Sequence, residues 1–289
     1  MLSGVGLGLR SEFLSSFLHH PRKNEVNFLE VAPENWIKTN IKKKAELKKF
    51  TETYPLVCHG LSLSIGDLKP LDLKFLDQLK QFFDHYNVQI YSEHLSYCGD
   101  ESGHLYDLMP LPFTQGMINY LIPRIQKVQE IIHRPLVLEN VSYYLSIKPE
   151  MTEIEFLLSI LNQSGALLLL DVNNVYVNSI NHHYDPYEFI DQIPTEKIAY
   201  IHIAGHYRES ENLIIDTHGA DIIDPVWDLL SFTYQRHGIF PTLLERDFNI
   251  PELDELFLET AKIKQYQCQS ELIKRGVLSC QRNQAIDLN

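Results

Sequence analysis

Short apolar runs alternate with longer amphipathic segments along most of the chain. The runs are rich in Leu, Ile and Val, which is typical of strands buried on both faces of a parallel sheet. They span residues 5–9, 26–31, 55–59, 89–94, 135–139, 166–171, 199–203 and 241–245. Between them, apolar residues recur with helical spacing, most clearly over 72–86, 113–133 and 153–165. Eight strand–helix units predict an α/β fold of the (β/α)8 TIM-barrel type.

An open, doubly wound sheet is the alternative architecture. The first strand region reads "GVGLGL", which has the wrong spacing for a dinucleotide-binding fingerprint. No low-complexity linker divides the sequence. We therefore expect one barrel domain over residues 1–289, with a C-terminal helix and tail from about 252 to 289.

Composition narrows the classes of protein and of partner. The formal net charge is −13, and the one basic cluster, 41–49, falls in a helical pattern. This argues against a nucleic-acid partner, which requires a basic stripe. Neither a signal peptide nor an apolar run long enough to span a bilayer is evident, so we expect no membrane partner. The four cysteines show no CxxC spacing, which favours a reducing compartment and predicts a cytoplasmic protein.

Residues able to bind metals stand at the ends of the predicted strands. In a barrel these ends meet at one face. The candidates at strand ends are His59, His94, Glu139, Asp171, Asn174, His202 and Glu245, and Asp216 and His218 follow in the long connection after the seventh strand. Buried together, carboxylates oppose one another's ionisation, and bound cations remove that cost. Any one residue could instead be a helix cap or part of a salt bridge, but so many at one face predict a metal centre.

The ligand types limit the metal and the chemistry. Nitrogen and oxygen ligands without sulfur suit Fe, Mn, Zn or Co, and the set is large enough for two or three ions. Glu93, His206 and Arg246 are adjacent to the ligand positions and are candidates for catalytic roles, although His206 could equally bind metal or touch substrate. Oxygen activation and metal-assisted hydrolysis use similar ligands, so residue types alone do not separate the two reactions.

Several motifs together resemble the DUF692 (UPF0276) family, the multinuclear non-heme iron-dependent oxidases. The resemblance runs from about residue 3 to 260 and rests on "NFLEVAPENW", "VCHGLSLSIG", "YSEHLSY", "LVLENVS", "LLLDVNNVYVNS", "IHIAGH", "DTHGADI" and "LLERD". It implies a barrel of the xylose-isomerase-like type with two or three iron ions. It also implies dioxygen as co-substrate, a ribosomally made peptide as substrate, modified at cysteine or another residue, and in several members a partner protein that presents the peptide.

The related endonuclease IV has three metal ions, and the resemblance implies how the ligands here divide among them. His59, His94 and Glu139 would hold one ion. Glu139 would bridge to a second ion held by Asp171, His202 and Glu245. Asp216 and His218 would hold a third, with Asn174 where endonuclease IV has a histidine. Because an amide binds metal more weakly than an imidazole, we expect this third ion to be labile or absent.

Three functions follow as hypotheses. The first is an iron-dependent oxidase acting on a peptide, with cysteine as the expected target and other divalent metals able to substitute for iron. The second is a divalent-metal hydrolase or isomerase acting on a phosphoester or a sugar. None of the predicted strand ends supplies the lysine expected of an aldose isomerase, and the net charge disfavours DNA. The third is a metal-dependent binding protein without catalysis.

Overall fold

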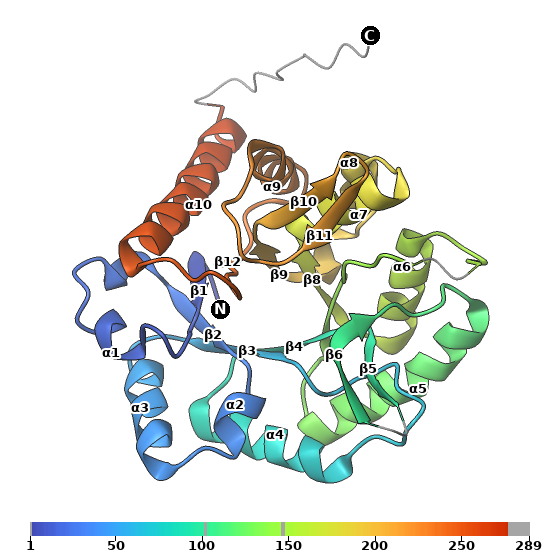
Figure 1. Cartoon of the computed structure of the whole chain (residues 1–289), viewed down its shortest axis with the longest axis horizontal. Helices are drawn as coiled ribbons and strands as arrows, with labels where there is room; N and C mark the ends of the chain where they lie inside the picture. The colour runs from blue at the N-terminus through green and yellow to red at the C-terminus, as the bar shows by residue number, and fades with distance from the viewer. Residues whose placement is uncertain (1, 101–102, 146–147, 277–289) are drawn as a thin grey trace.

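Eight parallel strands close into a barrel in the computed structural model, which describes residues 2–100, 103–145 and 148–276. Their order around the barrel is β1, β2, β3, β4, β7, β8, β9, β12 (Figure 1). The bounds are β1 Val5–Gly8, β2 Phe28–Val31, β3 Leu56–Gly60, β4 Ile90–His94, β7 Val137–Glu139, β8 Leu167–Asp171, β9 Ile198–Ile203 and β12 Thr242–Leu244. Each predicted strand overlaps one of these, so the predicted TIM barrel is confirmed.

Helices surround the barrel on its outer side (Figure 1). The longer ones are α3 Ile41–Thr51, α4 Leu73–Tyr86, α5 Gln115–Ile132, α6 Glu153–Ser164, α7 Val172–His182, α9 Asp224–His237 and α10 Leu253–Lys274, and the short ones are α1 Leu14–Phe17, α2 Glu34–Ile37 and α8 Pro186–Asp191. The three predicted helices are present as α4, α5 and α6. A capping box begins α6, in which Thr152 and Glu155 each accept a hydrogen bond from the other's backbone N–H. The predicted C-terminal segment is helical as α10, and its part from 277 to 289 lies outside the described residues.

The inside of the barrel is built in layers, because side chains two residues apart on a strand point the same way. A buried apolar cluster takes one residue from each of six strands: Phe28, Val57, Val137, Leu169, Tyr200 and Leu243. Two residues further along the same strands stand Glu30, His59, Glu139, Asp171, His202 and Glu245. A closed apolar floor therefore carries a ring of acidic residues and histidines at the carboxyl ends of the strands.

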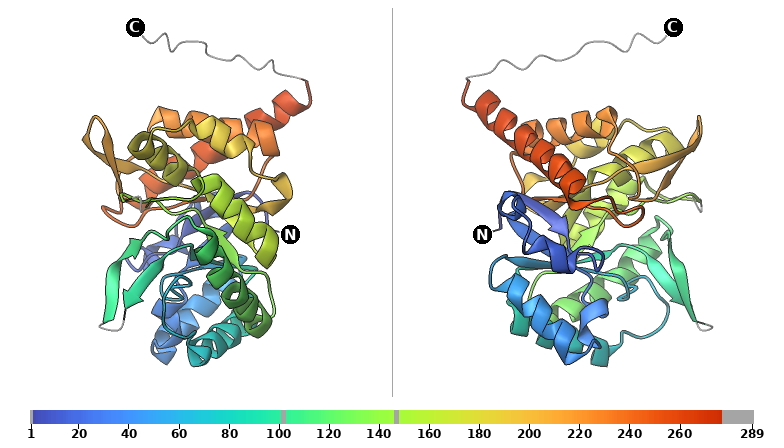
Figure 2. Two further views of the ribbon diagram at one scale, coloured as in Figure 1. Left: turned by 90° about the vertical axis from the view of Figure 1, so that its right-hand side faces the viewer. Right: turned by 60° about the vertical axis from the view of Figure 1, so that its left-hand side comes forward.

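Two hairpins extend from this end of the barrel (Figure 2). One follows β4 and consists of β5, Tyr97–Asp100, and β6, Gly103–Met109. The other follows β9 and consists of β10, His206–Ser210, and β11, Leu213–Asp216. Neither was predicted from the sequence. In the described ranges, no helix is both long enough and apolar enough to cross a bilayer.

Candidate metal centre

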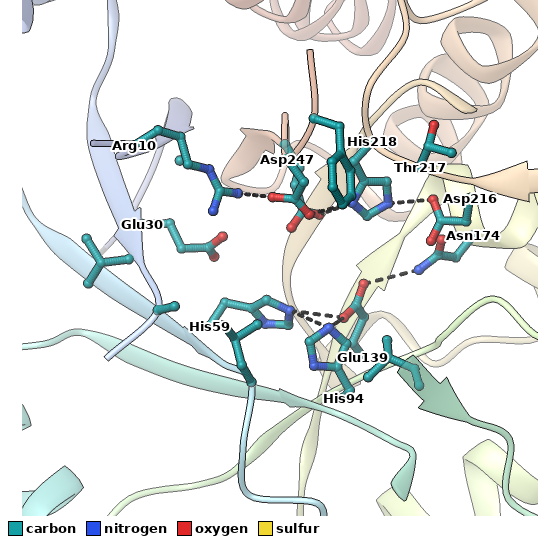
Figure 3. Close-up of a pocket in the computed structure, with 17 residues that line it drawn as sticks. Arg10, Glu30, His59, His94, Glu139, Asn174, Asp216, Thr217, His218 and Asp247 are labelled. Carbon is teal, nitrogen blue, oxygen red and sulfur yellow. Dashed lines mark hydrogen bonds and ion pairs between the residues drawn. The ribbon is translucent and has the colours of Figure 1, made fainter. Parts of the chain in front are cut away.

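A cavity of about 150 Å³ opens at the carboxyl end of the barrel (Figure 3). Five carboxylates line it, those of Glu30, Glu139, Asp216, Glu245 and Asp247. Among its described lining residues, Arg10 is the only Lys or Arg. Carboxylates gathered in a poorly solvated space repel one another. The cavity is therefore suited to binding cations.

His59, His94 and Glu139 point toward a common centre (Figure 3). His59 Nε2 lies 3.1 Å from His94 Nε2 and 3.2 Å from Glu139 Oε2, and His94 Nε2 lies 3.3 Å from the same oxygen. Two ligands about 2.1 Å from a shared ion are separated by about 3.0 Å at a right angle and about 3.4 Å at a tetrahedral angle. The three atoms thus have the spacing of ligands to one ion.

A second group lies deeper and shares Glu139. Glu139, Asp171, His202 and Glu245 each offer one atom, and these atoms lie within 4.8 Å of one another. All four side chains are buried. Local sequence fixes Asp171, which ends β8 and caps α7: its Oδ1 accepts a hydrogen bond from the backbone N–H of Asn174. Its other oxygen, Oδ2, makes no hydrogen bond with a described residue, and Asp171 lies just below the residues that line the cavity.

A third group consists of His218, Glu245 and Asp247. His218 Nδ1 lies 3.2 Å from Glu245 Oε2 and 3.4 Å from Asp247 Oδ2. Asp247 was not among the predicted ligands. It also forms an ion pair with Arg10 (Figure 3), and its side chain is 35% exposed. This group is therefore more open to solvent than the other two.

The predicted third set, Asn174 with Asp216 and His218, is only partly assembled. His218 Nε2 lies 2.7 Å from Asp216 Oδ1. Asn174 lines the same cavity, but its Nδ2 donates to Glu139 Oε1 and to the backbone oxygen of Asn140. In this orientation the Asn174 Nδ2 faces the Glu139 carboxylate, and Oδ1, the amide atom able to bind a metal, makes no hydrogen bond with a described residue.

Several buried polar atoms around the cavity make no hydrogen bond with any residue that the structure describes. They include Asp171 Oδ2 and Asn174 Oδ1. A buried polar atom without a partner costs about 1–3 kcal/mol. Two such acceptor atoms beside a set of carboxylates and imidazoles fit these residues to metal ions, which would satisfy both.

Burial and neighbouring charges shift the pKa values of the ionisable groups at this site. Burial lowers the pKa of the His59 imidazole, but the Glu139 carboxylate outweighs it and raises that pKa to about 9. Burial, with the positive charge of His59, lowers the pKa of His94 to about 4. Burial raises the pKa of Asp171 well above its usual range. Two adjacent imidazoles therefore differ in charge near neutral pH, with the proton on His59.

Glu93, one of the three predicted catalytic residues, is buried but does not line the cavity. Its Oε1 accepts hydrogen bonds from the Tyr91 hydroxyl and the Leu63 backbone N–H. Burial and the nearby Glu34 raise its pKa to about 8. A Cβ on Gly60 would lie 2.1 Å from Glu93 Oε1, so a larger residue there would have to displace the Glu93 carboxyl group. These contacts tie Glu93 to the segment that follows His59.

His206 and Arg246 also lie outside the cavity lining. His206 Nδ1 is 2.8 Å from Asn173 Oδ1, and Asn173 Nδ2 donates a hydrogen bond to Asp216 Oδ1. His206 is therefore linked to Asp216 only through the Asn173 side chain. Arg246 points away from the barrel mouth and pairs with Glu259 of α10 at 2.7 Å. Their positions support structural or positioning roles for both residues.

Glu30, Ser92 and Tyr200 have site contacts that the sequence analysis did not identify. Glu30 Oε2 accepts from the Tyr200 hydroxyl at 2.9 Å and lies 3.0 Å from His202 Nε2. The Ser92 hydroxyl lies 2.6 Å from that of Tyr200 and 2.8 Å from His59 Nδ1. The position of Glu30 at the end of a predicted strand, two residues beyond Phe28, is evident from the sequence, but its contacts with Tyr200 and His202 are not. No sequence signal marks Ser92 or Tyr200.

Comparison with known proteins gives consistent results. A family model described as "RiPP precursor modification enzyme MbnB/TglH/ChrH" matches residues 4–268. A UPF0276 protein of Shewanella sediminis is 54% identical over 263 residues, covering 91% of this chain and 94% of that protein. A UPF0276 protein of Acinetobacter baylyi is also 54% identical, over 93% of this chain and 92% of that protein.

Among solved structures, endonuclease IV from Thermus thermophilus matches with a TM-score of 0.60 at 12% identity, covering 92% of this chain and 99% of that one. A likeness at that identity shows the fold alone.

Proposed function

The chain belongs to the MbnB/TglH/ChrH family of RiPP precursor modification enzymes, and on this basis we propose that it is a multinuclear iron-dependent oxidase. Its substrate is a ribosomally made peptide, and its target is a cysteine of that peptide. Dioxygen is the co-substrate. The observation that carries the metal dependence is the triangle of His59 Nε2, His94 Nε2 and Glu139 Oε2.

The proposed ligands divide among two or three ions. His59, His94 and Glu139 hold the first, and Glu139, Asp171, His202 and Glu245 hold the second. His218 with Glu245 and Asp247 supplies a third position, to which Asp216 and Asn174 are adjacent. When bound, ferrous iron with open coordination positions supplies the reducing equivalents for dioxygen. Nitrogen and oxygen ligands also accept zinc and manganese, so these metals serve as probes.

The residues at the mouth suit entry of one side chain of an extended peptide. The cavity, at about 150 Å³, holds about five waters at about 30 Å³ each. Leu61, Leu108 and Phe248 form apolar parts of its lining, and Phe248 is 66% exposed. An apolar rim excludes water from a bound side chain, while the carboxylates below hold the cations. The two hairpins beside the mouth are our candidates for contact with a peptide-presenting partner protein.

The test uses protein reconstituted anaerobically with ferrous iron and then exposed to oxygen. The probes are a pool of synthetic peptides of 15 residues, each with one cysteine, and the same pool with serine in its place. Oxygen uptake and a mass change that require both iron and cysteine would support the proposal. Iron-loaded protein that leaves both pools unchanged, with or without a co-expressed partner, would contradict the cysteine target. Protein that binds no iron would contradict the metal centre itself.

A further inference from the structure

A continuous line of hydrogen bonds crosses the barrel beneath the cavity. It runs from His59 to Ser92, to Tyr200 and to Glu30, and His202 reaches the same Glu30 from the other side. The distances, in that order, are 2.8, 2.6, 2.9 and 3.0 Å. Ser92, Tyr200 and His202 are fully buried. The line therefore joins one histidine of the first ion group to one histidine of the second.

The chemistry of each group gives the line a direction. A carboxylate only accepts hydrogen bonds, so at Glu30 the Tyr200 hydroxyl and the His202 Nε2–H both donate. With its proton directed at Glu30, the Tyr200 oxygen is the acceptor for the Ser92 hydroxyl at 2.6 Å, a shorter contact than the 3.3 Å from that hydroxyl to the backbone oxygen of Cys58. The Ser92 oxygen then accepts from His59 Nδ1–H. Every donor in the line thus points toward Glu30.

This direction determines which ring nitrogen of each histidine carries a lone pair. In the neutral imidazole, a proton on His59 Nδ1 leaves the lone pair on Nε2, the atom that faces His94 and Glu139. A proton on His202 Nε2 leaves the lone pair on Nδ1, which lies 2.8 Å from Glu245 Oε2. Two lone pairs at that distance repel, so a proton without metal, or a metal ion when one is bound, must lie between these two atoms. The line therefore presents the right atom of each histidine to its ion.

We propose that Ser92, Tyr200 and Glu30 are positioning residues that fix the tautomers of His59 and His202 and thereby couple the two ion sites. The inference rests on the proposed metal centre. It assigns no contact with substrate to Ser92 or Tyr200. Partners of this kind typically change metal affinity by about 10- to 100-fold when removed. Because Tyr200 reaches both histidines, its hydroxyl contributes to both ions, whereas Ser92 acts through His59 alone.

The test measures zinc dissociation constants by chelator competition, so it does not depend on activity. The variants are Ser92→Ala and Tyr200→Phe. The matched control is Tyr234→Phe, because Tyr234 is also buried and also bonds a hydroxyl, that of Thr242, but lies outside the centre. We expect Tyr200→Phe to weaken zinc binding about 10- to 100-fold, and Tyr234→Phe to bind within about twofold of wild type. Thermal unfolding of each metal-free variant confirms that it folds.

A double-mutant comparison distinguishes an effect of Ser92 that passes through His59 from a general disturbance of packing in the barrel core. In a His59→Ala background, Ser92→Ala should have no further effect on the affinity for the remaining zinc, whereas Tyr200→Phe should still weaken that affinity through Glu30 and His202.

Wild-type zinc affinity in both Ser92→Ala and Tyr200→Phe would overturn the inference. If Tyr200→Phe does not fold, Ser92→Ala alone decides. Wild-type protein that binds no zinc would instead overturn the proposed metal centre. A weakening by Tyr234→Phe equal to that by Tyr200→Phe would show that only core packing is involved and would also overturn the inference.

Discussion

His59 and Glu139 approach each other at the mouth of the barrel, with 3.2 Å between His59 Nε2 and Glu139 Oε2. The two residues come from strands β3 and β7, which do not pair directly but lie on either side of β4. Glu139 also belongs to the deeper group around Asp171 and His202. This carboxylate is thus the point at which two ion sites meet, and the first prediction concerns it.

Replacing Glu139 with glutamine should remove the charge that two cations share. We expect Glu139→Gln to lose at least one ion per chain while its circular dichroism stays near that of wild type, since the apolar floor of the barrel is built from other residues. Metal per chain after desalting is the measurement. The control is Glu153→Gln, a buried carboxyl bonded to Asn178 outside the three ion groups, which should keep every ion. A full metal complement in Glu139→Gln would show that Glu139 is not a bridge.

The third position should be the weakest. Asp247 is partly exposed and shared with Arg10, and His218 stands in a loop with φ of +47°, a strained backbone for a residue other than glycine. Mild chelation should therefore remove this ion first. Asp247→Asn should abolish it, because the amide contributes no charge.

Asn174 distinguishes two arrangements of the third ion. If Asp247 is the ligand, Asn174→His should leave the chelation curve unchanged. If Asn174 belongs with Asp216 and His218, Asn174→His should tighten the site, since an imidazole is the stronger donor. We expect the first result, because His218 Nδ1 lies 3.2 Å from Glu245 Oε2 and 3.4 Å from Asp247 Oδ2. If Asn174→His binds the third ion more tightly and Asp247→Asn keeps that ion, the ligand set predicted from the sequence, Asn174 with Asp216 and His218, is the correct one.

Metal binding should release protons near neutral pH. His59, with its pKa raised to about 9, is protonated in the metal-free protein at pH 7, whereas His94, with a pKa lowered to about 4, is not. Because ligation requires the neutral form, binding displaces the His59 proton. Zinc affinity should therefore rise with pH above pH 7, and His202 and His218, whose pKa values the neighbouring carboxylates raise well above the usual range despite burial, should add to the release. Calorimetry of zinc binding at pH 7 in buffers of different ionisation enthalpy measures the release, and zero protons released would contradict this reading.

Arg246 should stabilise the fold rather than support metal binding. Its side chain is 5% exposed and pairs with Glu259, which is 18% exposed. Arg246→Met leaves that carboxylate unpaired and should lower the free energy of unfolding by about 3 kcal/mol. The control Arg236→Met breaks an exposed pair with Asp191 and should cost less than about 1 kcal/mol. Urea unfolding measures both, and metal content should not change in either. Loss of metal in Arg246→Met would show instead that Arg246 supports metal binding.

Strand alternation explains how far the sequence could predict the site. Because alternate residues point the same way, Glu245 and Asp247 face the cavity and Arg246 faces α10. Applied strictly, this rule would have placed Asp247 among the predicted ligands and left Arg246 out of the predicted site. The contact between Tyr200 and Glu30, 170 residues apart, could not be predicted, since it depends on how the strands are staggered around the barrel. The two hairpins were missed because exposed strands, such as β10, carry no apolar run.

The central claim is that at least two metal ions bind on either side of Glu139. The most direct measurement is anomalous diffraction at the iron edge from crystals grown anaerobically with ferrous iron. We predict one peak among His59, His94 and Glu139, and another among Glu139, Asp171, His202 and Glu245. No peak in this cavity, or a single peak that Glu139 does not touch, would contradict the claim.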